Sequence, residues 1–123
     1  MNITLISFSY PLEGSGIKIK ADKMVYSETT KKINAEGNVQ ISSGDIIIVG
    51  GRIETDLNAN YVIATDSVAI YENESYVTGE TLEYSFDTST GVIYNAKGSY
   101  SDWYFTSQRA YKDKKAFRLK KSK

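Results

Sequence analysis

Hydrophobic and polar residues alternate along most of the chain. Runs such as Val39-Gln40-Ile41 and Val68-Ala69-Ile70 place apolar residues at every second position, which is typical of β-strands with one buried face. Segments rich in Ser, Thr, Asn, Asp and Gly separate these runs, as tight turns require. No comparable stripe of helical period is present. The pattern therefore predicts an all-β chain of about a dozen short antiparallel strands.

A repeat of about 29 residues is superimposed on this alternation. A small residue followed three positions later by an apolar or small one occurs four times, at Ala21 and Met24, Gly50 and Ile53, Gly79 and Leu82, and Ser107 and Ala110. A pair of residues that tolerate turns recurs three times in the other half of the unit, at Gly37-Asn38, Asp66-Ser67 and Gly98-Ser99. Because stacked repeats place their apolar faces over one another, the sequence predicts a twisted β-taco, or open β-jellyroll, with a hydrophobic interior groove.

Composition and charge exclude several classes of function. Lys and Arg together number 15, as do Asp and Glu, so the chain lacks the basic field that attracts nucleic acid. It has no Cys and no His, which excludes disulfides, the common zinc sites and imidazole catalysis. We expect no cofactor, no metal site and no nucleic-acid partner. From Arg109 onward the sequence contains eight basic residues and one acidic residue. This excess of positive charge favours a solvated tail or edge strand over a phosphate site.

The length of 123 residues suits a single domain. We expect residues 17–111 to form the β-taco and residues 112–123 to form a basic C-terminal strand or tail. Residues 1–16 are expected to be an N-terminal segment or a first strand. Their apolar run, Ile3 to Tyr10, is too short to cross a bilayer and could also be the remnant of a trimmed signal.

Several motifs together resemble one bacterial family. They occur in the same order and spacing at Ala21 to Tyr26 (ADKMVY), Ala35 to Val39 (AEGNV), Gly79 to Tyr84 (GETLEY) and Asn95 to Gly98 (NAKG). This set resembles the OstA-like domain of lipopolysaccharide transport proteins, which is shared by the periplasmic bridge protein LptA and the N-terminal domain of the assembly protein LptD. The segments Asp102 to Tyr104 and Arg109 to Tyr111 are more similar to LptD.

The resemblance implies transport of lipopolysaccharide in the periplasm or at the periplasmic face of the outer membrane, and our hypothesis is that the domain acts as a passive conduit. The groove would hold the acyl chains of lipid A, and the end strands would pair with other OstA-like bridge proteins or, head to tail, with copies of this chain. Two departures from many LptD proteins are the absence of cysteines and of a barrel. They leave open whether the chain is one domain of a longer protein or a free-standing relative.

The resemblance also assigns candidate site residues. The residues expected to face lipid in the groove are Ile17, Ile19, Met24, Val39, Ile41, Ile46, Ile48, Ile53, Val68, Ile70, Val77, Leu82, Tyr84 and Phe105. The edge strands expected to contact partners contain Ile17, Lys18, Ile19 and Lys20 at one end, and Trp103, Tyr104, Phe105 and Thr106 at the other. The periodicity alone fits a dry core equally well, since a stacked sheet needs this filling with or without cargo.

Two other classes of function compete with transport. An enzyme would have to use carboxylates, of which the best candidates are Asp22, Asp66, Glu80 and Glu83. These acids fall at turns or at outward strand positions, where solvated carboxylates are ordinary, so we expect no enzyme and no catalytic residue. A structural scaffold of the β-solenoid type, or an interaction module without lipid, would have the same repeat. It would differ from a carrier in having a closed, dry interior.

Overall fold

The computed structural model describes residues 2–11, 16–56, 60–100, 103–112 and 117–120. No helix in these residues could span a membrane. Nine strands are described, in the order β1 (Asn2–Pro11), β2 (Lys18–Ser27), β3 (Lys32–Ser43), β4 (Ile46–Asp56), β5 (Val62–Glu72), β6 (Ser75–Ser85), β7 (Thr90–Tyr100), β8 (Trp103–Lys112) and β9 (Phe117–Lys120). They form one antiparallel sheet whose order in space follows the sequence. The all-β prediction is confirmed.

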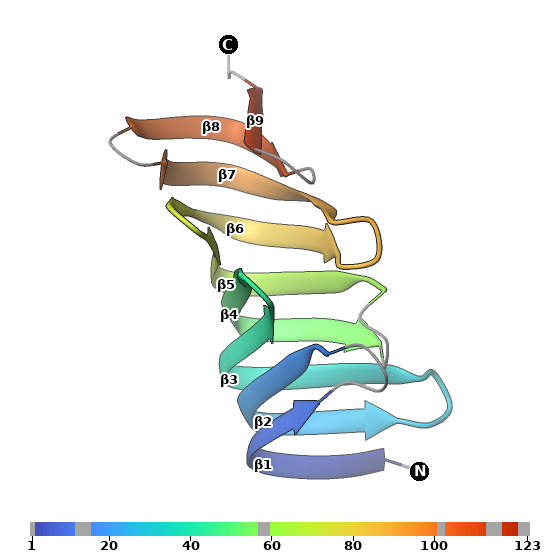
Figure 1. The fold of residues 1–123 in the computed structure, drawn as a ribbon. Helices are drawn as coiled ribbons and strands as arrows, with labels where there is room; N and C mark the ends of the chain where they lie inside the picture. Colours follow the sequence, from blue (N-terminus) through green and yellow to red (C-terminus); the bar gives the residue numbers. More distant parts are fainter. Residues whose placement is uncertain (1, 12–15, 57–59, 101–102, 113–116, 121–123) are drawn as a thin grey trace.

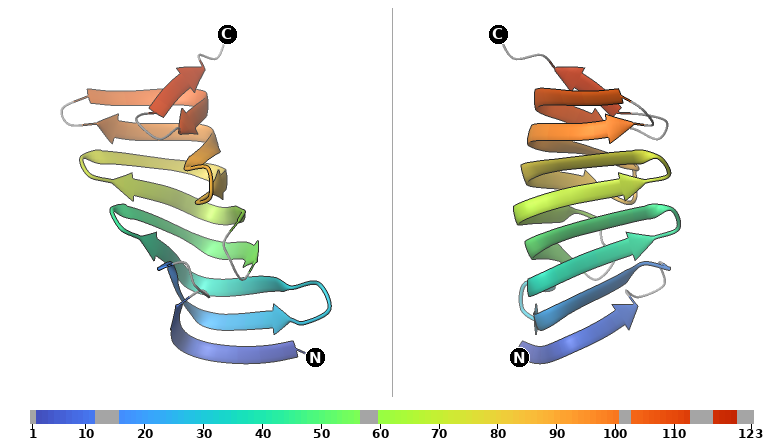
Figure 2. Two further views of the ribbon diagram at one scale, coloured as in Figure 1. Left: turned by 45° about the vertical axis from the view of Figure 1, so that its right-hand side comes forward. Right: turned by 90° about the vertical axis from the view of Figure 1, so that its left-hand side faces the viewer.

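The sheet is folded along its length into a trough. Figures 1 and 2 show the strands stacked from the N-terminal to the C-terminal end, each curving back so that two arms face each other. We call the arm that ends at the turns after β2 and β6 arm I, and the arm that ends at the turns after β3 and β5 arm II. Because each strand pairs with the same neighbour before and after its bend, the structure describes nine strands, mostly of 10 to 12 residues, rather than a dozen short ones.

In the even-numbered strands the bend lies at the repeat found in the sequence. In β4, for example, Gly50 and Ile53 are both buried, and the two residues between them are more exposed. The interposed pair shifts the alternation by one position, so that residues on both sides of the bend face the inside of the trough. The same buried pairs occur at Ala21 and Met24 in β2. The period of about 29 residues is therefore the spacing between the bend of one even-numbered strand and the bend of the next even-numbered strand.

In β3 and β5 the bend is made by consecutive residues in the left-handed region. The φ angles are 81° at Gly37 and 49° at Asn38, and 65° at Asp66 and 63° at Ser67. Gly, Asn and Asp adopt this conformation at lower cost than other residues. The ladder is interrupted next to these pairs. The turn-forming pairs of the sequence are thus the corners of long strands and do not end them.

Gly79 shows why the first residue of the repeated pair is small. It lies opposite Val68 in the ladder, and a Cβ atom at this position would lie 2.7 Å from the carbonyl oxygen of Tyr94. A side chain here would therefore collide with the backbone of the neighbouring strand at its bend.

A single hydrophobic core fills the space between the arms. Large and small side chains alternate across the strands: Ile53 lies opposite Ala35 and Ala64, and Leu82 lies opposite Ala64 and Ile93. All five residues are at most 2% exposed. Burial of each large aliphatic side chain contributes about 1.5–3 kcal/mol, so this packing is what holds the two arms together.

Candidate functional site

The inside of the trough contains most of the residues expected to face lipid. Twelve of the fourteen are buried in the core, with exposed fractions of 4% or less: Ile17, Ile19, Met24, Val39, Ile41, Ile48, Ile53, Val68, Ile70, Val77, Leu82 and Tyr84. Ile46 is partly buried and packs against this cluster. The side chain of Phe105 lies outside the described part of the structure. The structure places these residues on one continuous inner surface but does not test whether they contact lipid.

The inner surface is closed in this structure. Residues near the middle of both arms, such as Ile48 and Leu82, have no exposed surface, because each arm covers the other. An acyl chain could reach them only if the two arms moved apart or if it replaced side chains that now fill the core. The arms separate most easily at their free ends, which form the mouth of the trough.

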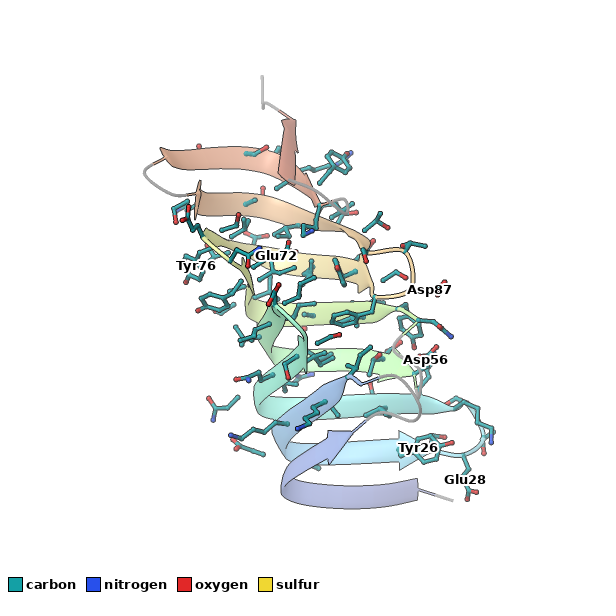
Figure 3. All side chains as sticks on the ribbon, viewed as in Figure 1. Tyr26, Glu28, Asp56, Glu72, Tyr76 and Asp87 are labelled. Carbon is teal, nitrogen blue, oxygen red and sulfur yellow. The ribbon has the colours of Figure 1, made fainter. Side chains whose placement is uncertain are left out.

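The mouth on arm I is one row of inward-facing residues aligned by the ladder from β2 to β8. In order, the row consists of Tyr26, Ile33, Thr55, Val62, Tyr84, Gly91 and Lys112. Figure 3 labels Tyr26, and at the same free end it labels Asp56, the last residue of β4, and Asp87 in the turn after β6. Apart from Thr55, whose hydroxyl donates to the carbonyl oxygen of Tyr61 at 2.7 Å, the row is apolar or aromatic up to Tyr84. It ends in a charged residue.

The mouth on arm II has a corresponding row, made of Ser43, Ile46, Glu72 and Ser75. Glu72, labelled in Figure 3, forms an ion pair with Lys112 of arm I. Its carboxylate lies 2.7 Å from the ammonium nitrogen of Lys112, and the side chains of Glu72 and Lys112 are 23% and 1% exposed. Since β5 and β8 are not neighbours in the sheet, this ion pair connects the two arms and does not run along one of them.

The hydroxyl group of Tyr84 lies near this ion pair. It is buried and makes no hydrogen bond within the described structure. Burial and the negative charge of Glu72 raise the pKa of Tyr84 to about 12, while the Ser89 hydroxyl, which is close but not placed to form a hydrogen bond, opposes that shift. The ring packs against Phe86 in an edge-to-face arrangement with centroids 5.0 Å apart. The polar end of the mouth thus combines an ammonium group, a carboxylate and a phenol.

Sequence reasoning missed the ion pair, although a signal for it was present. Glu72 was not among the candidate site residues, and Lys112 was expected only to begin the basic C-terminal strand or tail. Each lies two positions after a buried residue, Ile70 and Ala110 respectively, and so continues the inward-facing alternation of its strand. A charged residue at an inward-facing position of a strand was the signal in the sequence that could have identified both residues.

One of the two expected edges is wrong. Lys18, Ile19 and Lys20 pair with β3 on one side and with Ser9, Tyr10 and Pro11 of β1 on the other. They lie inside the sheet because the apolar N-terminal run forms a strand of its own. At the other end, Trp103 to Thr106 pair with β7 on one side. On the other side of β8, the described strand β9 pairs with Arg109 to Lys112 and leaves Trp103 to Thr106 uncovered. The edges of the described sheet are therefore β1 and the Trp103 end of β8 with β9.

The carboxylates considered for an enzyme lie on the outside of the trough. Three of them hold the bends of neighbouring strands together: Asp22 accepts a hydrogen bond from Asn38 at 3.0 Å, Asp66 lies 3.4 Å from Arg52, and Glu80 accepts from Asn95 at 2.9 Å. Glu83 lines a shallow hollow of about 420 Å³ on arm I. The described residues contain no cluster of His, Cys, Asp or Glu that could hold a metal ion.

Comparisons with known proteins agree with this architecture. The chain is 28% identical over 106 residues to the LPS-assembly protein LptD of Cupriavidus necator, which covers 80% of this chain and 13% of that protein. It is 29% identical over 80 residues to LptD of Neisseria gonorrhoeae, covering 65% of this chain and 10% of that protein. The chain therefore spans about a tenth of the length of these relatives.

A solved structure has the same fold. LptH of Pseudomonas aeruginosa, described as the LptA-homologous periplasmic component of the lipopolysaccharide transport device, superposes with a TM-score of 0.78 over 91% of this chain and 87% of its own, at 14% identity. Residues 18–116 match the family described as LptA/(LptD N-terminal domain) LPS transport protein, which confirms the resemblance seen in the sequence motifs. The chain belongs to the LptA and LptD N-terminal domain family of lipopolysaccharide transport proteins.

Proposed function

We propose that this domain carries lipopolysaccharide through the periplasm by holding the acyl chains of lipid A between its two arms. The observation that carries the proposal is the inner surface, which runs without a break across the stacked strands and consists almost entirely of apolar residues. Each methylene group moved from water into such a surface gains about 0.8 kcal/mol. A lipid with several acyl chains could therefore be held with few polar contacts.

Crosslinking can test where the lipid lies. A photoreactive amino acid at Ile48 or Leu82, both without exposed surface, should crosslink to labelled lipopolysaccharide. The same group at Tyr76, which is 39% exposed and lies on the outside of arm II, is the matched control. Crosslinking confined to Tyr76, or absent at all three positions, would contradict transport through the trough.

We further propose that the domain pairs edge to edge with other bridge proteins of this family, or head to tail with copies of itself. Strands at the edge of an open sheet present unpaired N–H and C=O groups to a partner strand. The edges available for this are β1 and the Trp103 end of β8.

Because the chain has no cysteine, introduced cysteines can report on this contact without background. Single cysteines placed in turn along β1 of one copy and along Trp103 to Thr106 of another should form mixed disulfides at one register. A cysteine at Thr78, on the outer face of β6, which is paired on both sides, should form none. Equal and weak crosslinking at all positions would contradict edge pairing.

A scaffold without cargo is the second candidate, and the complete burial of the inner residues favours it. A scaffold would keep its core closed in the presence of lipid. The crosslinking experiment distinguishes the two candidates, since only a carrier brings labelled lipid to Ile48 and Leu82.

A further inference from the structure

Three inward-facing positions at the C-terminal end of the mouth stand next to one another. Tyr84 lies opposite Gly91, and Gly91 lies opposite Lys112. A Cβ atom at Gly91 would lie 2.6 Å from the ring of Tyr84, so the absence of a side chain leaves this space to the tyrosine. Gly91 on β7 thereby leaves room between the phenol of Tyr84 on β6 and the ammonium group of Lys112 on β8, the two strands that flank it.

Lys112 carries a charge although its side chain is buried. The side chain of Lys112 is 1% exposed, and a buried ammonium group needs an acceptor that compensates for the loss of water. Glu72 supplies one from the opposite arm at 2.7 Å. A movement that opens the mouth here separates these two charges, and an anion that enters can then take the place of the carboxylate beside Lys112.

The Tyr84 hydroxyl is a second donor at the same place. It is buried, makes no hydrogen bond within the described structure, and is close enough to Glu72 that the carboxylate raises its pKa. A group with several acceptor oxygens, such as a phosphate, could accept from Lys112 and Tyr84 together. A neutral sugar or an aliphatic chain could not replace the charge of Glu72.

We propose that Lys112 and Tyr84 bind the anionic group of an amphiphile whose chain lies in the trough, and that Glu72 occupies this site in the empty domain. This inference rests on the proposed function and specifies where the head of the ligand lies. The apolar part of the mouth around Tyr26, Ile46 and Phe86, which pack against the core, admits the chain. The ion pair between Glu72 and Lys112 holds the mouth closed until an anionic ligand replaces the carboxylate of Glu72.

The test is displacement of an uncharged apolar dye from the domain by three probes at concentrations below micelle formation. The probes are dodecyl phosphate, dodecyl maltoside and inorganic phosphate. Wild-type protein should bind dodecyl phosphate about tenfold or more tightly than dodecyl maltoside, the gain expected from a charge-assisted contact. Inorganic phosphate should displace no dye and should not compete with dodecyl phosphate at similar concentrations.

Lys112→Met should abolish the preference for the phosphate and leave binding of the maltoside unchanged. Since this variant leaves Glu72 without its partner, the double variant Glu72→Met/Lys112→Met serves as the second test, because apolar residues can replace a buried ion pair without loss of folding. Asp66→Asn, which removes the charge of an acid paired with Arg52 at 66% exposure of both side chains, is the matched control and should keep the preference.

The outcomes separate the two proposals. If neither amphiphile displaces the dye from wild-type protein, the proposed function fails and the anionic site fails with it. If both bind equally well, or if the double variant keeps the preference for dodecyl phosphate, the anionic site alone is refuted. Binding of inorganic phosphate as tight as that of dodecyl phosphate would mean a site for a soluble anion and would also refute it.

Discussion

Replacement of Leu82 by Ala tests whether the two arms are held together by close packing. Leu82 has no exposed surface and faces the trough just after the bend of β6. Its neighbours in the ladder are Ala64 on one side and Ile93 on the other. Ala64 is too small to fill the space that a shortened side chain would leave.

The magnitude follows from the atoms removed. The substitution deletes three carbon atoms, which corresponds to about 2.4 kcal/mol of lost transfer free energy at about 0.8 kcal/mol each. The unfilled cavity increases the cost, so that the free energy of unfolding should fall by about 3–5 kcal/mol. This is a large part of the stability of a domain of this size.

The assay is equilibrium unfolding in urea, followed by circular dichroism. Ile63→Ala is the control, because Ile63 lies on the outer side of the same arm and is 37% exposed; it should cost about 1 kcal/mol or less. If Leu82→Ala costs no more than Ile63→Ala, the core between the arms is not closely packed and the reasoning on the closed trough is wrong.

Three further predictions concern single positions. Gly79→Ala should lower the free energy of unfolding by about 2 kcal/mol or more because of the backbone collision, whereas Gly44→Ala, in an open turn with a φ of 55°, should cost only about 1 kcal/mol; urea unfolding measures both. Asn38→Ala removes the bond to Asp22 and a residue suited to positive φ, and should cost about 1 kcal/mol in the same assay. The pKa of Tyr84 is about 12 in the folded protein against an ordinary value of 10.0, so the folded protein holds the phenolic proton more tightly than the unfolded chain does. The resulting contribution to folding stability is complete below pH 10 and is lost as the pH rises through 12. Tyr84→Phe should therefore make the loss of stability between pH 10 and 12 less steep, and an unchanged slope in denaturation at several pH values would contradict the assignment.

The trough could be predicted from the sequence because each bend depends on a few residues that are close together in the chain. An interruption of the alternation between Gly50 and Ile53, or between Gly79 and Leu82, keeps the same face buried on both sides of a bend, and the regular spacing stacks these bends. The position of the first strand could not be predicted in this way. The apolar run from Ile3 to Tyr10 fits a strand or a trimmed signal equally well, and the pairing of β1 with β2 is what removes Lys18 to Lys20 from the edge.

The ion pair could not be predicted because it depends on how the arms lie across the trough. Glu72 and Lys112 belong to strands separated by β6 and β7, so no turn or register places one against the other. They meet only because the twist of the sheet shifts one arm along the other. The sequence does indicate each residue separately, since among the inward-facing positions that the structure describes these two are the charged ones. In a domain whose inner surface is otherwise uncharged and mostly apolar, a charged residue at an inward-facing position costs folding free energy. A function at the mouth of the trough explains why both charges are present better than stability does.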